Sequence, residues 1–338
     1  MKAVQLTQYG SPEVLEYLTV PDLTPAAGEV LIRVESASVN YADIARRANI
    51  PYPFPTPLPF IPGSEAAGTI EAVGDGVNGL AVGTPVFALV GTGSNAYAQY
   101  VVTAATQVIP IPSGVSYDEA AALPVAGTTA LLILREMAAL QPGESVLIQG
   151  AAGGVGSYAV QLARLMGAGL IIGATSSPDK FSAAMAHGAH HVVDYTQPGW
   201  TEQVGKLTDG RGVDVVLEMH GGHTFGSSLR VLAPFGRLVV YGIASREPLR
   251  FSDEHIHHFF YNPALNQSIL VFNLGLWFGL RPAGAGKAMG DIIGYVASGQ
   301  VKVPVNHRFP LSQAAEAHRL IEARRTTGKV ILKPWAEA

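Results

Sequence analysis

A glycine-rich turn joins an apolar strand directly to an amphipathic helix in residues 146–166, which read VLIQGAAGGVGSYAVQLARLM. In the helical part, Val155, Ala159 and Leu162 recur at the three- and four-residue spacing that gives a helix one apolar face. A second apolar strand is predicted at residues 169–174. Strand, turn, helix and strand in this order predict a βαβ unit with parallel strands.

The turn has the composition of a phosphate-binding site. At the start of a helix the first amides have no intrahelical partner and the helix dipole is positive, so backbone N–H groups alone can bind a pyrophosphate. Gly153, Gly154 and Gly156 lack the side chains that would block a close approach, although Ala151 stands where the dinucleotide fingerprint has its first glycine. The alternative is a glycine-rich turn without a ligand. The backbone positions expected to face the phosphates are Ala152, Gly153, Gly154 and Val155.

The end of the second strand predicts which dinucleotide the turn prefers. A unit that binds NAD normally has a carboxylate about 20 residues after the glycines, which binds the ribose 2′-hydroxyl, whereas this strand ends in ATSS, residues 174–177. The hydroxyls of Ser176 and Ser177 and the ammonium of Lys180 could receive a 2′-phosphate, so NADPH is favoured over NADH. The NADH interpretation stays open because Asp179 lies close by and Lys180 could be an ordinary solvated residue.

The composition excludes several classes of function. A net charge of −4 and a pI near 6.2 argue against a surface for nucleic acid or anionic membranes. The chain has no cysteine, which excludes disulfides and thiolate metal sites. No secretory signal is visible, and the longest apolar stretch near the C-terminal side, residues 269–280, is too short to cross a membrane. We therefore expect a cytoplasmic protein whose partner is a small uncharged molecule, not a nucleic acid or a membrane.

The 338 residues suit two domains, and the strand pattern changes along the chain. Before residue 120, short strands alternate with turns in an antiparallel, barrel-like pattern, with strands at 3–6, 29–37, 68–73, 85–89 and 98–102. From Tyr117 onward, helices alternate with buried strands, which predicts a doubly wound parallel sheet. Its strands are predicted at 146–149, 169–174, 191–193, 213–218 and 237–241. The expected domains are 1–120, 121–265 and a segment 266–338 that returns to the first domain.

The returning segment and two loops carry further expectations. It is predicted to contain a strand at 268–274, a helix at 286–298 and strands around Val305 and Val330. Six prolines in residues 51–62 predict an extended, stiff loop at the mouth of the cleft. Residues 253–263, DEHIHHFFYNP, are predicted to form a loop, in which the histidines at 255, 257 and 258 could bind a metal, contact a substrate or be solvated. His220 and His223 are expected to be loop histidines with satisfied hydrogen bonds.

The whole chain resembles the zinc-independent quinone oxidoreductases of the medium-chain dehydrogenase/reductase superfamily. The resemblance implies a Rossmann domain and a GroES-like antiparallel β-barrel domain. The stretches that carry it are SVNYADIARR (38–47), PFIPGSEAAGTIEAVGDGV (59–77), AYAQYVV (96–102), AALPVAGTTA (121–130), GAAGGVGSYAVQLARLMGA (150–168), TSSPDK (175–180), GRGVDVVLE (210–218) and GKVIL (328–332).

In zinc-dependent members of this superfamily a catalytic cysteine and histidine bind the metal, and a four-cysteine loop binds a structural zinc. Motif alignment with them places Asn40 and Ser64 at the catalytic positions, and the four-cysteine loop is absent between Phe87 and Tyr97. An amide and a hydroxyl are poor zinc ligands. The resemblance therefore implies metal-free hydride transfer from NADPH to a quinone. An NADPH-dependent ene or enoyl reductase acting on a conjugated C=C bond remains an alternative, as does a low-turnover NADPH-binding protein with a structural, regulatory or RNA-binding role.

The resemblance also implies the site residues. For an oxyanion on the substrate, the expected donors are the Asn40 amide or the Tyr41 or Tyr52 hydroxyl. Asp43 is expected to organise backbone amides. The residues implied to lie near the cofactor are Asn40, Asp43, Thr129, Ser176, Lys180, Tyr195, Gly242, Ile243, Phe272, Asn273 and Lys329. A homodimer is expected, paired through the strand at 268–274.

Overall fold

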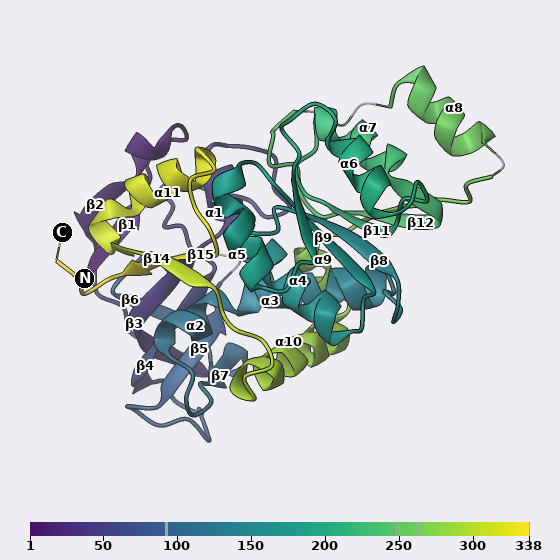
Figure 1. Cartoon of the computed structure of the whole chain (residues 1–338). Coiled ribbons are helices and arrows are strands. Elements are labelled where there is room, and N and C mark those ends of the chain that lie inside the picture. The colour runs from purple at the N-terminus through teal and green to yellow at the C-terminus, as the bar shows by residue number, and fades with distance from the viewer. Residues whose placement is uncertain (92–93, 248, 250, 263, 338) are drawn as a thin grey trace. The chain divides into compact units, whose positions relative to one another are not determined.

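The computed structural model describes residues 1–91, 94–247, 249, 251–262 and 264–337. It divides into two compact units. The first unit comprises Met1–Val125, Ile293–Gly299 and Val303–Ala338, and the second comprises Ala126–Ile292 and Gln300–Lys302. Figure 1 shows the elements of both.

The first unit is built on a seven-stranded sheet in the order β14-β15-β3-β4-β5-β7, with β6 paired to β3, and on a two-stranded ribbon of β1 and β2. All its pairs are antiparallel except β14 with β15, which confirms the expected antiparallel pattern. The returning C-terminal strand β15 pairs with the long strand β3. The strands are β1 Lys2–Gln5, β2 Glu16–Thr19, β3 Glu29–Val39, β4 Glu65–Val73, β5 Pro85–Leu89, β6 Tyr100–Ala104, β7 Val108–Pro110, β14 Val305–Pro310 and β15 Lys329–Lys333.

Three α-helices belong to the first unit: α1 Tyr41–Arg47, α2 Tyr117–Ala122 and α11 Ala314–Glu322. Local sequence accounts for where α2 begins, because Ser116 and Glu119 form a reciprocal capping box. The core of the unit combines inward-facing strand residues such as Val34 and Ile70 with Leu311 and Ala317 from the returning segment. The C-terminal residues are therefore part of this unit's core.

The second unit contains a six-stranded, wholly parallel sheet in the order β10-β9-β8-β11-β12-β13. This is the strand order of a doubly wound dinucleotide-binding sheet, so the predicted fold class is confirmed. The central strand β8 is buried along its whole length, and its three central residues, VLI at 146–148, are apolar as burial on both faces requires. The strands are β8 Ser145–Gln149, β9 Leu170–Thr175, β10 His191–Asp194, β11 Val213–Glu218, β12 Leu232–Val240 and β13 Ser268–Val271.

Helices cover both faces of this sheet, with α4 and α5 on one side and α6 and α7 on the other (Figure 1). Trp200 and Val204 of α6 and Phe225 and Leu229 of α7 pack on the sheet in one apolar cluster. The helices are α3 Pro124–Leu132, α4 Gly154–Leu165, α5 Phe181–Ala186, α6 Trp200–Leu207, α7 His223–Arg230, α8 Asp253–Tyr261, α9 Leu274–Leu280 and α10 Pro282–Ala297. No helix in the described ranges is long and apolar enough to cross a membrane.

Three sequence-based assignments differ from the structure. The predicted strand at 268–274 ends at Val271, because Asn273 caps α9 through its side chain. The predicted loop at 253–263 is instead helix α8, which begins where the Ser252 hydroxyl accepts from the His255 amide; Pro263 lies outside the described residues. Residues 266–292, assigned from sequence to the returning segment, lie in the second unit, where β13 pairs with β12.

A buried histidine links the returning segment to the N-terminal strands. His318 of α11 is fully buried, and its Nε2 lies 3.1 Å from the hydroxyl of Tyr97. Burial lowers the pKa of His318 to about 3, with a smaller contribution from the nearby Arg47 guanidinium. In the unfolded chain the histidine pKa returns to about 6.5. Between the folded pKa of about 3 and this value, the unfolded state therefore binds one proton that the folded state does not bind.

Replacing His318 by glutamine is therefore expected to make the fold less sensitive to acid. Since the folded pKa is lowered to about 3, wild-type stability falls as the pH drops below about 6.5, and the wild type should lose about 2 kcal/mol more free energy of unfolding than H318Q between pH 7 and 5. Urea denaturation of both proteins at the two pH values measures this difference. Comparing the two proteins at each pH largely cancels the contribution of Asp43, whose pKa burial raises to about 6. An equal loss in both proteins would contradict the role of His318.

Candidate functional site

The glycine turn has the geometry of a phosphate-binding helix N-terminus. Gly153 is the N-cap of α4 and has no side chain that could cap the first amides of this helix. A Cβ at Gly156 would lie 2.1 Å from the carbonyl oxygen of Gly150, so only glycine lets the helix approach the strand end this closely. Ala152 is buried, whereas Gly153, Gly154 and Val155 are half-buried. The residues present fit a pyrophosphate bound by backbone amides.

The other expected residues of the second unit lie where its parallel strands end. Ser176 follows β9, Tyr195 follows β10, Gly242 follows β12 by two residues, and Phe272 follows β13. Parallel strands end at one edge of the sheet, so these positions share the edge that carries the glycine turn after β8. The structure thus brings together residues that are more than a hundred positions apart in the sequence.

The remaining cofactor candidates of this unit differ in exposure. Ile243 is exposed, while Thr129 of α3 and Phe272 are buried. The side-chain oxygen of Asn273 accepts from the Leu276 amide at 3.2 Å, so it caps α9 and leaves the side-chain NH₂ as the group that could meet a ligand.

Ser176 and Lys180 form a pair of donors at this edge. The Nζ of Lys180 lies 3.5 Å from the Oγ of Ser176, and both residues are half-buried. Ser177 instead caps the short helical turn that follows, because its hydroxyl accepts from the Asp179 amide. The backbone of Tyr195 donates to the Thr175 carbonyl, which places Tyr195 beside the end of β9. An ammonium and a hydroxyl at this place fit a 2′-phosphate.

The sequence analysis did not identify the buried carboxylate of Glu218, which lies at the end of β11. Glu218, at the end of β11, accepts from the amides of His220 at 3.0 Å and Gly221 at 2.8 Å, and from the side-chain amide of Gln149 at 2.6 Å. Burial raises the pKa of Glu218, and the hydrogen bonds oppose that rise. The carboxylate therefore holds the loop after β11 against the end of β8. An acid inside an apolar strand was the signal that could have revealed it.

His220 agrees with the expected description of a loop histidine with hydrogen-bond partners, whereas His223, expected to be a loop histidine as well, is the first residue of α7. His220 is buried, and its Nδ1 lies 3.1 Å from the Gly221 carbonyl and 3.2 Å from the Thr224 hydroxyl. Its ring centroid is 5.2 Å from that of Tyr195. The imidazole of His220, in the loop after β11, therefore packs against the ring of Tyr195.

In the first unit, Asn40, Ser64, Glu65 and Lys329 form a polar cluster. The Lys329 ammonium donates to Asn40 Oδ1 at 2.6 Å and lies 3.3 Å from Glu65 Oε2. Asn40 Nδ2 donates to Glu65 Oε2 at 2.6 Å and to Ser64 Oγ at 3.3 Å. Glu65 Oε1 accepts from the Val125 amide at 2.6 Å. Both N–H groups of Asn40 are therefore directed at partners within the cluster, and the donor role expected of this amide stays a prediction.

Asp43 holds the backbone on both sides of the polar cluster, next to Asn40 and next to Ser64. Its carboxylate accepts from the backbone amides of Asn40 at 2.8 Å and Gly63 at 3.1 Å, and from the Tyr97 hydroxyl at 3.3 Å. Gly63 has a φ of +96°, and a Cβ there would lie 2.4 Å from the Tyr97 ring. Asp43 thus organises backbone amides, as expected from the sequence, and glycine is required beside it.

The proline-rich segment is arranged around a buried arginine. The guanidinium of Arg46 donates to the Thr56 hydroxyl at 3.0 Å and to the Pro55 carbonyl at 2.8 Å. It also lies over the rings of Phe60 at 4.3 Å and Tyr52 at 5.5 Å. Tyr52 is held by these contacts while 38% of it stays exposed, and Tyr41 at the start of α1 is exposed to a similar extent.

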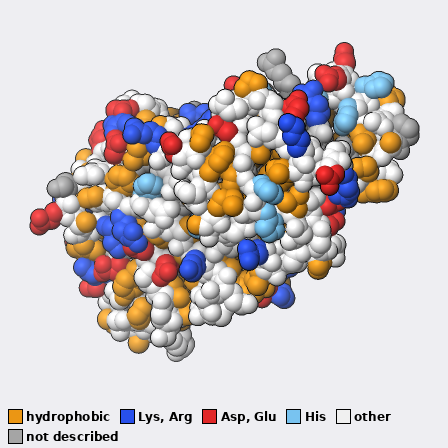
Figure 2. Space-filling model, in the orientation of Figure 1, with side chains coloured by type: hydrophobic (Ala, Val, Ile, Leu, Met, Phe, Trp, Pro, Cys, Tyr) orange, Lys and Arg blue, Asp and Glu red, His pale blue; other side chains and the backbone are white. Residues whose placement is uncertain are grey.

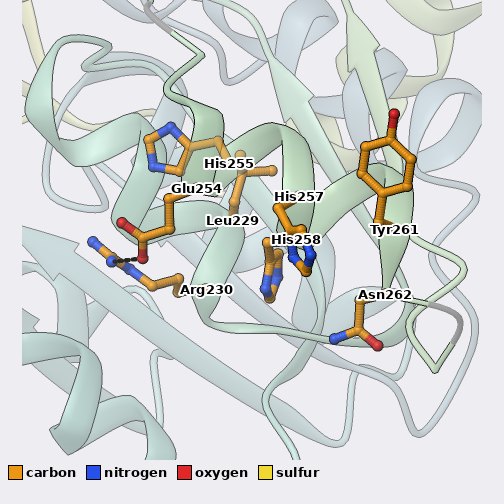
Figure 3. Close-up of a pocket in the computed structure, with 8 residues that line it drawn as sticks. All are labelled: Leu229, Arg230, Glu254, His255, His257, His258, Tyr261 and Asn262. Carbon is orange, nitrogen blue, oxygen red and sulfur yellow. Dashed lines mark hydrogen bonds and ion pairs between the residues drawn. The ribbon is translucent and has the colours of Figure 1, made fainter.

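The histidines of α8 border a hollow of about 560 Å³ (Figure 3). It is lined by Leu229, Arg230, Glu254, His255, His257, His258, Tyr261 and Asn262. Glu254 and Arg230 form an ion pair across it at 3.1 Å. Figure 2 shows histidine side chains on the surface over α8. Within the described part of the chain, no group of three or more His, Cys, Asp or Glu side chains could hold a metal ion.

Comparisons with known proteins agree with both halves of this architecture. Residues 26–113 match the family model of the alcohol dehydrogenase GroES-like domain, and residues 187–332 match the model described as a zinc-binding dehydrogenase. A quinone oxidoreductase from Pseudomonas aeruginosa is 35% identical over 98% of this chain and 99% of its own length. A 2-haloacrylate reductase from Burkholderia is 32% identical, over 99% of both chains.

Among solved structures, a quinone oxidoreductase from Escherichia coli in complex with NADPH matches with a TM-score of 0.88 and 28% identity, over 99% of this chain and all of the other. Sequence motifs, strand order and near-complete coverage of these relatives all agree. The chain therefore belongs to the zinc-independent quinone oxidoreductase family of the medium-chain dehydrogenase/reductase superfamily.

Proposed function

We propose that the protein is a cytoplasmic NADPH-dependent quinone oxidoreductase that transfers hydride without a metal. The observation that carries this proposal is the polar cluster. Asn40 and Ser64 stand at the positions that motif alignment assigns to zinc ligands, and the Lys329 ammonium lies 2.6 Å from Asn40 Oδ1. An amide, a hydroxyl and an ammonium do not form a zinc site. The Lys329 ammonium thus supplies a positive charge at the place where zinc-dependent relatives bind the metal.

The sheet edge of the second unit supports NADPH as the cofactor. Bound NADPH would supply the hydride. The amides at Gly153, Gly154 and Val155 would hold its pyrophosphate, while Ser176 and Lys180 would hold its 2′-phosphate. Tyr195, Gly242, Ile243, Phe272 and Asn273 complete the proposed binding edge, with Thr129, Asn40, Asp43 and Lys329 as further proposed contacts. The quinone oxidoreductase of Escherichia coli, solved with NADPH, has the same fold.

The acceptor is proposed to be a small quinone. A quinone is electrophilic enough to accept hydride without Lewis-acid activation, so the protein needs only to orient it and to stabilise negative charge on its oxygen. Tyr41 and Tyr52 are proposed donors, because their hydroxyls are attached to partly exposed side chains.

A second candidate is reduction of a C=C bond conjugated to a carbonyl. The observation that favours it is the 2-haloacrylate reductase of Burkholderia, whose name describes reduction of a conjugated acid. Hydride delivery to a conjugated carbon needs the same cofactor and the same oxygen stabilisation as quinone reduction. The two candidate functions therefore differ only in which acceptor, a quinone or a conjugated C=C bond, the protein reduces faster.

A homodimer through β13 is part of the proposal. This strand is the edge of the parallel sheet, and the Val271 side chain is 73% exposed. An uncovered apolar edge favours pairing with a second copy.

Purified protein is expected to oxidise NADPH with a simple quinone at least roughly tenfold faster than with an alkyl enone at equal concentration. The loss of NADPH absorbance measures both rates. Turnover with the enone alone would make the protein an ene reductase. If NADPH binds tightly and neither acceptor is reduced, a low-turnover structural or regulatory role replaces the enzymatic proposal.

Lys180→Ala is expected to weaken NADPH binding by about tenfold to a hundredfold and to change NADH binding by less than about twofold, since only NADPH has the phosphate that the ammonium contacts. Fluorescence titration with both cofactors measures the dissociation constants. Lys206→Ala on the exposed surface of α6 is the matched control. Equal losses for both cofactors in K180A would contradict the phosphate contact.

Light scattering at micromolar concentration is expected to give twice the chain mass of 35.4 kDa. Val271→Asp should shift the protein toward the monomer, because it introduces a charge at the pairing edge. Val82→Asp, at a site 63% exposed in the first unit, is the control and should remain dimeric. A monomeric wild type would contradict the dimer, and a dimeric V271D would contradict this edge.

A further inference from the structure

The hydrogen bonds of Asn40 determine where the Ser64 hydroxyl can point. An ammonium can only donate and an ionised carboxylate can only accept. Lys329 Nζ therefore requires the amide oxygen of Asn40 to face it at 2.6 Å, and Glu65 Oε2 requires the amide nitrogen to face it at 2.6 Å. The orientation of the amide follows from the chemistry of its two charged neighbours.

Ser64 must then accept from Asn40. The second N–H of the amide is directed at Ser64 Oγ, 3.3 Å away. Because the serine oxygen is the acceptor in this contact, its own hydrogen points elsewhere. No acceptor for that hydrogen is found among the described residues. The cluster thus leaves one hydroxyl whose hydrogen points away from the Asn40 amide and has no acceptor among the described residues.

Ser64 is also the member of the polar cluster that reaches solvent. Glu65 is fully buried, Lys329 is 3% exposed and Asn40 is 8% exposed, whereas Ser64 is half-buried. Its backbone is restrained on both sides, since the Gly63 amide donates to Asp43 and the Ser64 carbonyl accepts from the Val90 amide at 3.0 Å. A donor held rigidly at the surface of a buried charged network has the arrangement of an oxyanion-stabilising group.

We propose that Ser64 is a catalytic residue whose hydroxyl donates a hydrogen bond to the carbonyl oxygen of the electron acceptor. This role rests on the proposed reduction of a quinone or a conjugated carbonyl. NADPH would give a hydride to the acceptor and would thereby be oxidised to NADP⁺. Negative charge would develop on the acceptor oxygen, and a proton from solvent would then neutralise it, so that both electrons of the hydride stay on the reduced acceptor. Ser64 keeps its proton throughout and acts by stabilising the oxyanion. Lys329 and Asn40 are positioning residues that turn the serine hydrogen away from the polar cluster.

Other groups nearby are less suited to this role. The Asn40 amide has no N–H left over, and the Lys329 ammonium is buried beneath it. Asp43 accepts three hydrogen bonds and, when ionised, has no proton to donate. Tyr41 and Tyr52 are the remaining candidate donors, so Y41F and Y52F serve as comparison variants in the test.

Ser64→Ala is expected to lower kcat for the preferred acceptor about tenfold to a hundredfold, which is the loss found when one oxyanion donor is removed. The dissociation constant for NADPH should change by less than about twofold, since Ser64 has no proposed contact with the cofactor. Ser64→Thr keeps a hydroxyl and should recover most of the activity. Ser113→Ala, in an exposed loop of the first unit, is the matched control. Thermal melting of each variant separates a catalytic loss from unfolding.

A second measurement does not depend on turnover. Substituted phenols resemble the anion that forms on the reduced quinone, so wild type with NADP⁺ should bind them more tightly as their anionic oxygen becomes more basic. S64A should weaken this binding about tenfold and flatten its dependence on the phenol pKa. A protein that reduces neither acceptor but shows this loss would refute the proposed function and keep Ser64 as a donor. If S64A matches wild type in kcat, or binds phenols as wild type does, the assignment of Ser64 is overturned. An effect in Y41F or Y52F alone would assign the donor to that tyrosine.

Discussion

The buried ammonium of Lys329 is the charge on which the polar cluster of the first unit depends. It pairs with Glu65, which is fully buried, and it holds the amide oxygen of Asn40. Removing one member of such a pair leaves an uncompensated buried charge, at a cost of about 3–5 kcal/mol. The pair is kept in place by β15, which brings Lys329 beside β3 through backbone pairing. A strand from the end of the chain thus completes a site that begins at residue 40.

The second unit reaches its functional arrangement by a different route. Parallel strands place all their C-terminal ends at one edge, so the residues that follow these ends lie together. Glu218 then stabilises the irregular backbone at that edge, because its carboxylate binds the amides of His220 and Gly221. Backbone geometry arranges the glycine turn and the loop after β11, whereas paired side-chain charges arrange the polar cluster of the first unit.

Sequence patterns were sufficient where a local rule controls the structure. The glycine turn, the apolar strands β8 and β11 and the alternation that produces a parallel sheet were all predictable from composition and spacing. The patterns failed where a cap or a tertiary contact decided the outcome. Asn273 ends one predicted strand early by capping α9, and Ser252 starts α8 in a segment whose histidines and aromatics suggested a loop. Capping depends on the conformation of one residue, which an average over a window cannot detect.

The sequence by itself determined the fold class, the dinucleotide turn and the absence of thiolate chemistry, because each follows from residue types and their spacing over short distances. Only the tertiary structure decided what the polar residues do. Asn40 looked like a donor for a substrate oxygen, yet Glu65 and Ser64 take both of its N–H groups. The identity of its partners depends on Lys329, almost three hundred residues away, and on which atoms of each group face one another. Hydrogen-bond direction depends on such three-dimensional neighbours, and a linear pattern contains no information about them.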